Sequence, residues 1–132
     1  MTTALSHTFI LVHDQDAALT FYRDVLGLEV RNDVPFDSFR WLSLSAPGQP
    51  EVEIVLARPE MGHSAEDSAA ISALMAKGVM SSVIFRIDDV DETFEKIRAS
   101  GAEVLQEPIE QPYGVRDFAF RDPSGNHIRF SG

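Results

Sequence analysis

A nine-residue pattern occurs twice in this chain and constrains the fold more than any other feature. The two segments are "YRDVLGLEV" at 22–30 and "KIRASGAEV" at 96–104, which align without gaps through Gly27 and Gly101. In each segment a helical stretch stops at glycine, which adopts the positive φ of a helix C-terminus readily, and an extended segment follows. A repeated supersecondary unit predicts two modules with the same architecture.

The residues around each repeat extend this plan. Apolar runs at 8–12 and 82–87 predict strands before the helices, with Asp14 and either Asp88 or Asp89 as N-caps. Further strands are expected at 39–45 and 51–57 in the first half, and at 115–121 and 126–131 in the second. The turn Asp122-Pro123-Ser124-Gly125 fits type I. Each half therefore predicts the order β-α-β-β-β.

The domain boundaries follow from this pattern. We expect a single domain over residues 1–132, with module one at about 5–58, a helical linker at about 59–80 and module two at about 81–132. The linker contains a predicted helix at 67–77, which would pack on the outside or against a partner subunit. The stretch "NDVPFDSF" predicts a loop whose Phe36 would serve as an exposed lid.

Charge and composition exclude several classes of partner. The chain has 132 residues, a net charge of −10 and no cysteine. Such a charge repels phosphate backbones, so no nucleic-acid partner is expected. No apolar run is long enough to span a membrane, and the start lacks a signal peptide, so we expect a cytoplasmic protein. Disulfides and thiol chemistry are excluded.

Three segments carry a family resemblance that covers nearly the whole chain. They are "SHTFILVHDQDAALTFYRDVLGLEV", "FRIDDVDETFEKIRASGAEV" and "GVRDFAFRDPSGNHIRF". Together they resemble the vicinal oxygen chelate superfamily, which includes glyoxalases, bleomycin resistance proteins and dioxygenases. The resemblance implies an α+β fold in which two tandem βαβββ modules form curled mixed sheets around a cleft. It also implies a homodimer with ligand pockets at the subunit interface.

The resemblance further implies four metal-ligand positions, one on the first and one on the last strand of each module. In this sequence they are His7, Glu53, Ser82 and Arg129. Serine is a poor ligand for a borderline divalent metal, and a guanidinium offers no lone pair. His7 and Glu53 alone supply fewer than the three protein ligands of a catalytic site. We therefore expect no cofactor and no catalytic metal.

The altered site has two interpretations. In the first, Glu53 and Arg129 form an ion pair that fills the former metal position. In the second, the pair joins His7 and His127 as a polar floor that orients a small organic ligand, with Trp41, Phe39 and Tyr113 as aromatic walls. Phe39 also fits the core, whereas the polar tips of Trp41 and Tyr113 suit a pocket wall.

Four functions remain open at this stage. The first is a small-molecule binding protein of the drug-sequestering kind, without a metal. The second is a divalent-metal-dependent lyase or dioxygenase that uses His7 and Glu53 with a non-standard third ligand such as His127. The third is metal-free isomerase or lyase chemistry with His7 or Glu53 as general base. The fourth is a structural or regulatory domain with a vestigial pocket.

Overall fold

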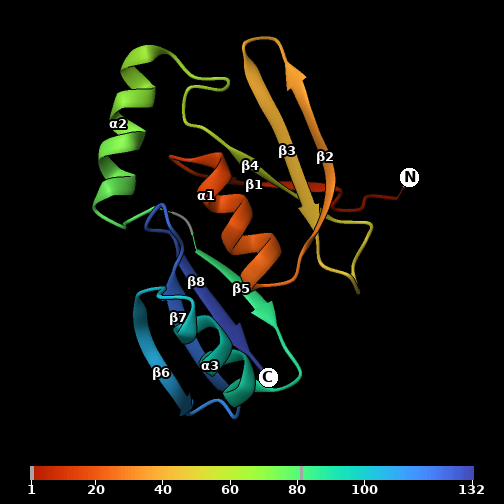
Figure 1. Cartoon of the computed structure of the whole chain (residues 1–132), viewed down its shortest axis with the longest axis vertical. Helices are drawn as coiled ribbons and strands as arrows, with labels where there is room; N and C mark the ends of the chain where they lie inside the picture. Colours follow the sequence, from red (N-terminus) through yellow and green to blue (C-terminus); the bar gives the residue numbers. More distant parts are fainter. Residues whose placement is uncertain (1, 81) are drawn as a thin grey trace. The chain divides into compact units, whose positions relative to one another are not determined.

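The structure, a computed structural model, describes residues 2–80 and 82–132. Contacts divide the chain into two compact units, one through Ser72 and one from Ala73, so the division falls within the linker helix. Figure 1 labels the elements. Their bounds are β1 (His7–Leu11), α1 (Gln15–Leu19), β2 (Glu29–Phe36), β3 (Phe39–Ser45), β4 (Glu53–Ala57), α2 (Ala65–Ala76), β5 (Ser82–Arg86), α3 (Val90–Ala99), β6 (Val104–Glu110), β7 (Arg116–Arg121) and β8 (His127–Ser131).

Each unit contains a four-stranded mixed sheet, so the predicted pair of βαβββ modules is confirmed. The strand orders are β1-β4-β3-β2 and β5-β8-β7-β6, with equivalent neighbours in the two modules. The first strand pairs in parallel with the last strand of its own module, and all other pairs are antiparallel. The prediction of one domain over 1–132 stays a prediction.

The caps and stops predicted for α1 and α3 are present, and the linker helix predicted at 67–77 runs from Ala65 to Ala76. The side chain of Asp14 accepts a hydrogen bond from the backbone of Ala17, and Asp89 accepts one from Glu92. Gly27 and Gly101 have φ of 83° and 90°, as expected for residues that end helices. The first helix differs from expectation in its second half, because 20–25 form a π-helical turn.

The predicted loop around Phe36 is wrong. Strand β2 runs through Phe36, which pairs with Phe39 across a tight turn. Pro35 does not prevent this because β2 is an edge strand, where a missing backbone donor costs no ladder bond. Phe36 is thus a strand residue that is 52% exposed, and its role as a lid stays a prediction.

One face of each sheet forms a core with its helix. In module two, Phe118 and Phe130 stack with ring centroids 4.9 Å apart, and Phe94 of α3 lies 5.4 Å from Phe118. In module one, α1 packs against the sheet that carries the buried residues Ile10, Leu42, Leu44 and Leu56 (Figure 1). Because strand side chains alternate, each sheet turns a different set of residues to its opposite face.

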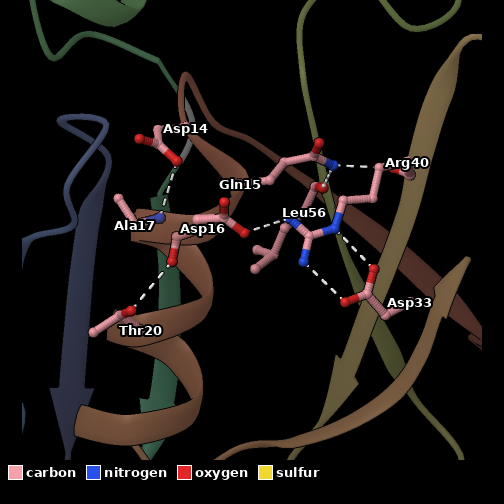
Figure 2. Close-up of polar contacts among 8 residues, drawn as sticks. All are labelled: Asp14, Gln15, Asp16, Ala17, Thr20, Asp33, Arg40 and Leu56. Carbon is pink, nitrogen blue, oxygen red and sulfur yellow. Dashed lines mark hydrogen bonds and ion pairs between the residues drawn. The ribbon is translucent and has the colours of Figure 1, made fainter.

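An arginine fixes the hairpin of module one to its helix. Arg40 of β3 donates to both carboxylate oxygens of Asp33, at 2.8 Å each, and to Asp16 of α1 at 2.7 Å (Figure 2). The Gln15 side chain donates to the carbonyls of Arg40 and Leu56. These contacts set the position of the β2–β3 hairpin, which carries much of the candidate site.

The helix caps generate a first prediction. Replacing Asp89 by alanine removes the acceptor for the Glu92 N–H and should lower the free energy of unfolding by about 1 kcal/mol. Urea denaturation followed by circular dichroism measures this. The control is Asp88→Ala, because Asp88 is exposed and is not the cap. Equal losses in the two variants would contradict the assignment of Asp89 as the cap.

Candidate functional site

The sheet face of module one opposite the helix brings three of the predicted residues together. His7 lies opposite Glu53 in the parallel register, with Nε2 3.5 Å from a Glu53 oxygen. The ring of Trp41 lies 6.4 Å from that of His7. Glu53 also accepts hydrogen bonds from Ser43 at 2.7 Å and from Asn32 at 3.2 Å. We call Glu53 with Ser43, Asn32 and His7 the Glu53 network.

The carboxylate of Glu53 is held in its ionised form. Its side chain is only 18% exposed, so burial opposes the charge. The hydrogen bond from Ser43 is the main cause that nevertheless lowers the pKa of Glu53, with a further contribution from Asn32. The result is a half-buried negative charge supported mainly by neutral donors.

An aromatic cluster adjoins this network. Trp41 contacts Phe9 edge-on at 6.0 Å and Phe36 at 5.9 Å, measured between ring centroids. Phe9 is 49% exposed, and Trp41 is half-buried. We call Trp41, Phe9 and Phe36 the Trp41 cluster. It gives this sheet face a group of aromatic rings, inclined to one another, beside a carboxylate.

Phe39 lies apart from the Trp41 cluster. It borders a cavity of about 420 Å³ at the end of the sheet where β4 finishes, together with Gln15, Ser38, Arg40, Arg58, Glu60 and Met61. Phe39 and Trp41 are two residues apart in β3, a spacing that gives side chains the same strand face. Their surroundings differ because Phe39 stands at the hairpin turn.

Module two presents a different polar network on its sheet face. The carboxylate of Asp117 is buried and accepts hydrogen bonds from Gln106 and Gln111, both at 2.8 Å, and from the Tyr113 hydroxyl at 3.3 Å. Arg129 lies 3.2 Å from the same carboxylate and donates to the side-chain oxygen Oε1 of Gln106 at 2.9 Å. We call these five residues the Asp117 network.

Arg129 therefore has a counter-ion within its own module. Its side chain is 24% exposed and that of Asp117 is 1% exposed, so the pair is largely removed from water. Burial acts to raise the pKa of Asp117, but the hydrogen bonds from Gln111 and Gln106 and the charge of Arg129 lower it on balance. The expected Glu53–Arg129 ion pair stays a prediction, and neither residue depends on it for a partner.

His127 occupies a position that motif spacing alone does not reveal. It lies opposite Ser82 in the parallel register, as Glu53 lies opposite His7, whereas Arg129 lies opposite Ile84. Burial lowers the pKa of His127, and the charges of Arg129 and Arg121 add to this. Nε2 of the neutral ring lies 3.4 Å from an Arg129 nitrogen, so it serves as an acceptor.

Sequence reasoning missed Phe9 and Ser43 in module one and Asp117, Gln106 and Gln111 in module two. Phe9 and Ser43 stand two residues from His7 and Trp41 in the same strands, a spacing that places them on the same face. An aspartate within the apolar strand "RDFAF" signals a buried carboxylate that needs partners. The glutamines carry no comparable signal.

The donor set of the four implied ligand positions does not fit a catalytic metal. His7 and Glu53 are suitable ligands, but Ser82 is a weak one and Arg129 is a cation. The described residues contain no group of three or more His, Cys, Asp or Glu side chains arranged to hold a metal ion.

Within residues 2–80 and 82–132, no helix is both long and apolar enough to cross a membrane.

The chain has two βαβββ modules, each with a mixed sheet whose first and last strands begin with polar residues. This arrangement is that of the glyoxalase/bleomycin-resistance class of fold. Residues 4–130 match the model of the Glyoxalase/Bleomycin resistance protein/Dioxygenase superfamily, and the chain belongs to that superfamily.

Three similar proteins illustrate the range of this superfamily. UcmS2 is 37% identical with a TM-score of 0.89, over 99% of this chain and 98% of that one. TnmS3, an antibiotic binding protein from Streptomyces sp. CB03234, is 26% identical with a TM-score of 0.76, over 98% and 94% of the two chains. A lactoylglutathione lyase of Haemophilus influenzae is 31% identical, over 94% of this chain and 88% of its own.

The Asp117 network generates a second prediction. Replacing Asp117 by asparagine removes the charge that balances Arg129 and puts a donor where Tyr113 and Arg129 need an acceptor. We expect the free energy of unfolding in urea to fall by about 2–3 kcal/mol at neutral pH. Asp88→Asn, the same change at an exposed site, should have little effect.

The same network predicts a dependence on pH. The pKa of Asp117 is lower in the folded chain than in the unfolded chain. The Asp117 charge therefore contributes fully to the stability of the fold above the pKa of the unfolded chain, and this contribution is lost as pH falls through the pKa of the folded chain. The difference in stability between the natural chain and Asp117→Asn should shrink on acidification from about pH 5 to about pH 3. A difference that stays constant over this range would contradict the assignment.

Proposed function

We propose that this protein binds a small organic molecule, in the manner of the antibiotic-sequestering members of its superfamily, without a catalytic metal. The observation that carries the proposal is the Trp41 cluster beside the Glu53 network on one sheet face. Ligand sites in proteins combine aromatic walls with a few polar groups that fix orientation. Both kinds of group are present here on neighbouring strands.

The residues at the implied metal positions support the metal-free part of the proposal. A cation held by His7 and Glu53 would keep only two protein ligands from this set, and the guanidinium of Arg129 would repel it. Arg129 is held by Asp117 at 3.2 Å, so its charge belongs to a network that has no need of a metal. The similarity to the antibiotic binding protein TnmS3 agrees with this function.

The alternative is a divalent-metal-dependent lyase or dioxygenase. The 3.5 Å approach of His7 to Glu53 favours it, as does the 31% identity to a lactoylglutathione lyase. His127 is the residue that would complete a set of three ligands.

We also expect a homodimer, because the resemblance implies that ligand pockets lie between subunits.

Calorimetric titration distinguishes the two functions. The chelator-treated protein is titrated with Ni²⁺, Zn²⁺, Mn²⁺ and Fe²⁺, and separately with metal-free bleomycin as a probe of cationic antibiotics. We expect no metal to bind below millimolar concentration and the antibiotic to bind without one. Trp41→Leu should weaken antibiotic binding about tenfold or more, because it removes an aromatic surface.

The control is Val79→Ala, which changes an exposed apolar residue outside the cluster and should leave binding unchanged. Micromolar metal binding that disappears in His7→Ala would establish the metal-dependent alternative instead. Failure of both metals and antibiotic to bind would count against either function.

A further inference from the structure

The carboxylate of Glu53 has no lysine or arginine at ion-pair distance among the described residues of module one. Its hydrogen-bond donors are the Ser43 hydroxyl and the Asn32 amide, both neutral, and the His7 imidazole lies 3.5 Å away. The charge of Arg31 lowers the pKa of Glu53 only as a minor cause, after the hydrogen bonds from Ser43 and Asn32. A carboxylate that is 18% exposed and has no guanidinium or ammonium beside it favours an added cation.

The arginines nearest in sequence to this sheet face are engaged elsewhere. The Arg31 guanidinium donates to the Pro50 carbonyl at 2.5 Å. Arg40 shares its guanidinium between Asp33 and Asp16, as Figure 2 shows. Arg31 cannot pair with Glu53 without giving up its contact to the β3–β4 loop, and Arg40 cannot do so without giving up the contacts that hold the β2–β3 hairpin.

Module two provides the contrast. Asp117 is a carboxylate on a sheet face too, more deeply buried than Glu53, but Arg129 balances its charge. A cationic ligand therefore gains nothing at Asp117 that Arg129 does not already supply. The need for a cation is specific to Glu53, and the net charge of −10 attracts cations to the protein at long range.

The Trp41 cluster supplies the second half of a recognition site. Phe9 pairs with Val55, which stands two residues after Glu53 in β4, so Phe9 lies on the same face as the carboxylate. Phe9 and Phe36 are about half exposed, and both contact the ring of Trp41. Exposed aromatic faces attract flat rings by stacking and cations through the ring quadrupole.

We infer that this face selects a protonated amine carried on a flat aromatic body, with Glu53 binding the ammonium and the Trp41 cluster binding the ring. The inference rests on the proposed function and names the class of ligand for the same site. Charge complementarity to an unbalanced carboxylate is what separates this class from neutral or acidic aromatics.

The test compares three naphthalene compounds that share one ring and differ in charge. They are 2-naphthylmethylammonium, 2-naphthylmethanol and 2-naphthoate. Trp41 is the only tryptophan, so its indole N–H gives a single signal in a ¹⁵N-correlated NMR spectrum of the whole chain. Shifts of that signal during titration give the dissociation constant of each compound at this face.

We expect the ammonium compound to bind about tenfold more tightly than the alcohol, and the carboxylate to bind most weakly. Glu53→Gln keeps an acceptor for Ser43 and Asn32 but removes the charge, so it should abolish the preference while the alcohol binds as before. Glu66→Gln makes the same charge change at an exposed helix position and should retain the preference.

Other outcomes would overturn the inference in distinguishable ways. If all three compounds bind alike, the charge preference is wrong and the proposed binding function stands. If the preference appears only in Arg31→Gln, the Arg31 guanidinium already balances the charge of Glu53 and the inference fails. If none of them shifts the Trp41 signal at millimolar concentration, this face is not the site, and the calorimetric titration decides the proposed function separately.

Discussion

Parallel pairing between the first and last strand of each module is the constraint on which the candidate site depends. It brings residues that are far apart in sequence into register, so that His7 stands opposite Glu53 and Ser82 opposite His127. A parallel pair requires a crossover connection, and here the helix and the two intervening strands supply it. One face of each sheet is buried against that helix, which leaves the opposite face for polar and aromatic side chains.

The two modules share this geometry but stabilise a carboxylate on the sheet face in different ways. Each carries a carboxylate that is largely removed from water on the sheet face away from the helix. In module two the charge of Asp117 is balanced by Arg129 and by three neutral donors. In module one the charge of Glu53 is supported by a hydroxyl and an amide, with His7 nearby. The two carboxylates also stand on strands that are not equivalent, because β4 of module one corresponds to β8 of module two and β7 corresponds to β3.

The fold could be predicted from sequence because its signals are local and repeated. The glycine-stopped segments at Gly27 and Gly101, the capping aspartates and the Asp122 turn each have a direct physical cause. The loop predicted around Phe36 is wrong because the proline and aspartates of "NDVPFDSF" favour turns, and only the sheet order shows that β2 is an edge strand, which tolerates Pro35. The partner of Arg129 could not be predicted, since the register of β7 against β8 brings Asp117 and Arg129 together and motif spacing does not contain it.

The charge of Arg129 is accounted for within module two. Asp117 lies 3.2 Å from the guanidinium, and Gln106, Gln111 and the Tyr113 hydroxyl donate hydrogen bonds to the same carboxylate. In module one, no described lysine or arginine lies at ion-pair distance from Glu53, whose carboxylate stands beside the His7 ring, and that ring lies 6.4 Å from the ring of Trp41. A ligand that carries both a cation and an aromatic ring therefore gains more at Glu53 than at Asp117, because only Asp117 already has a guanidinium beside it.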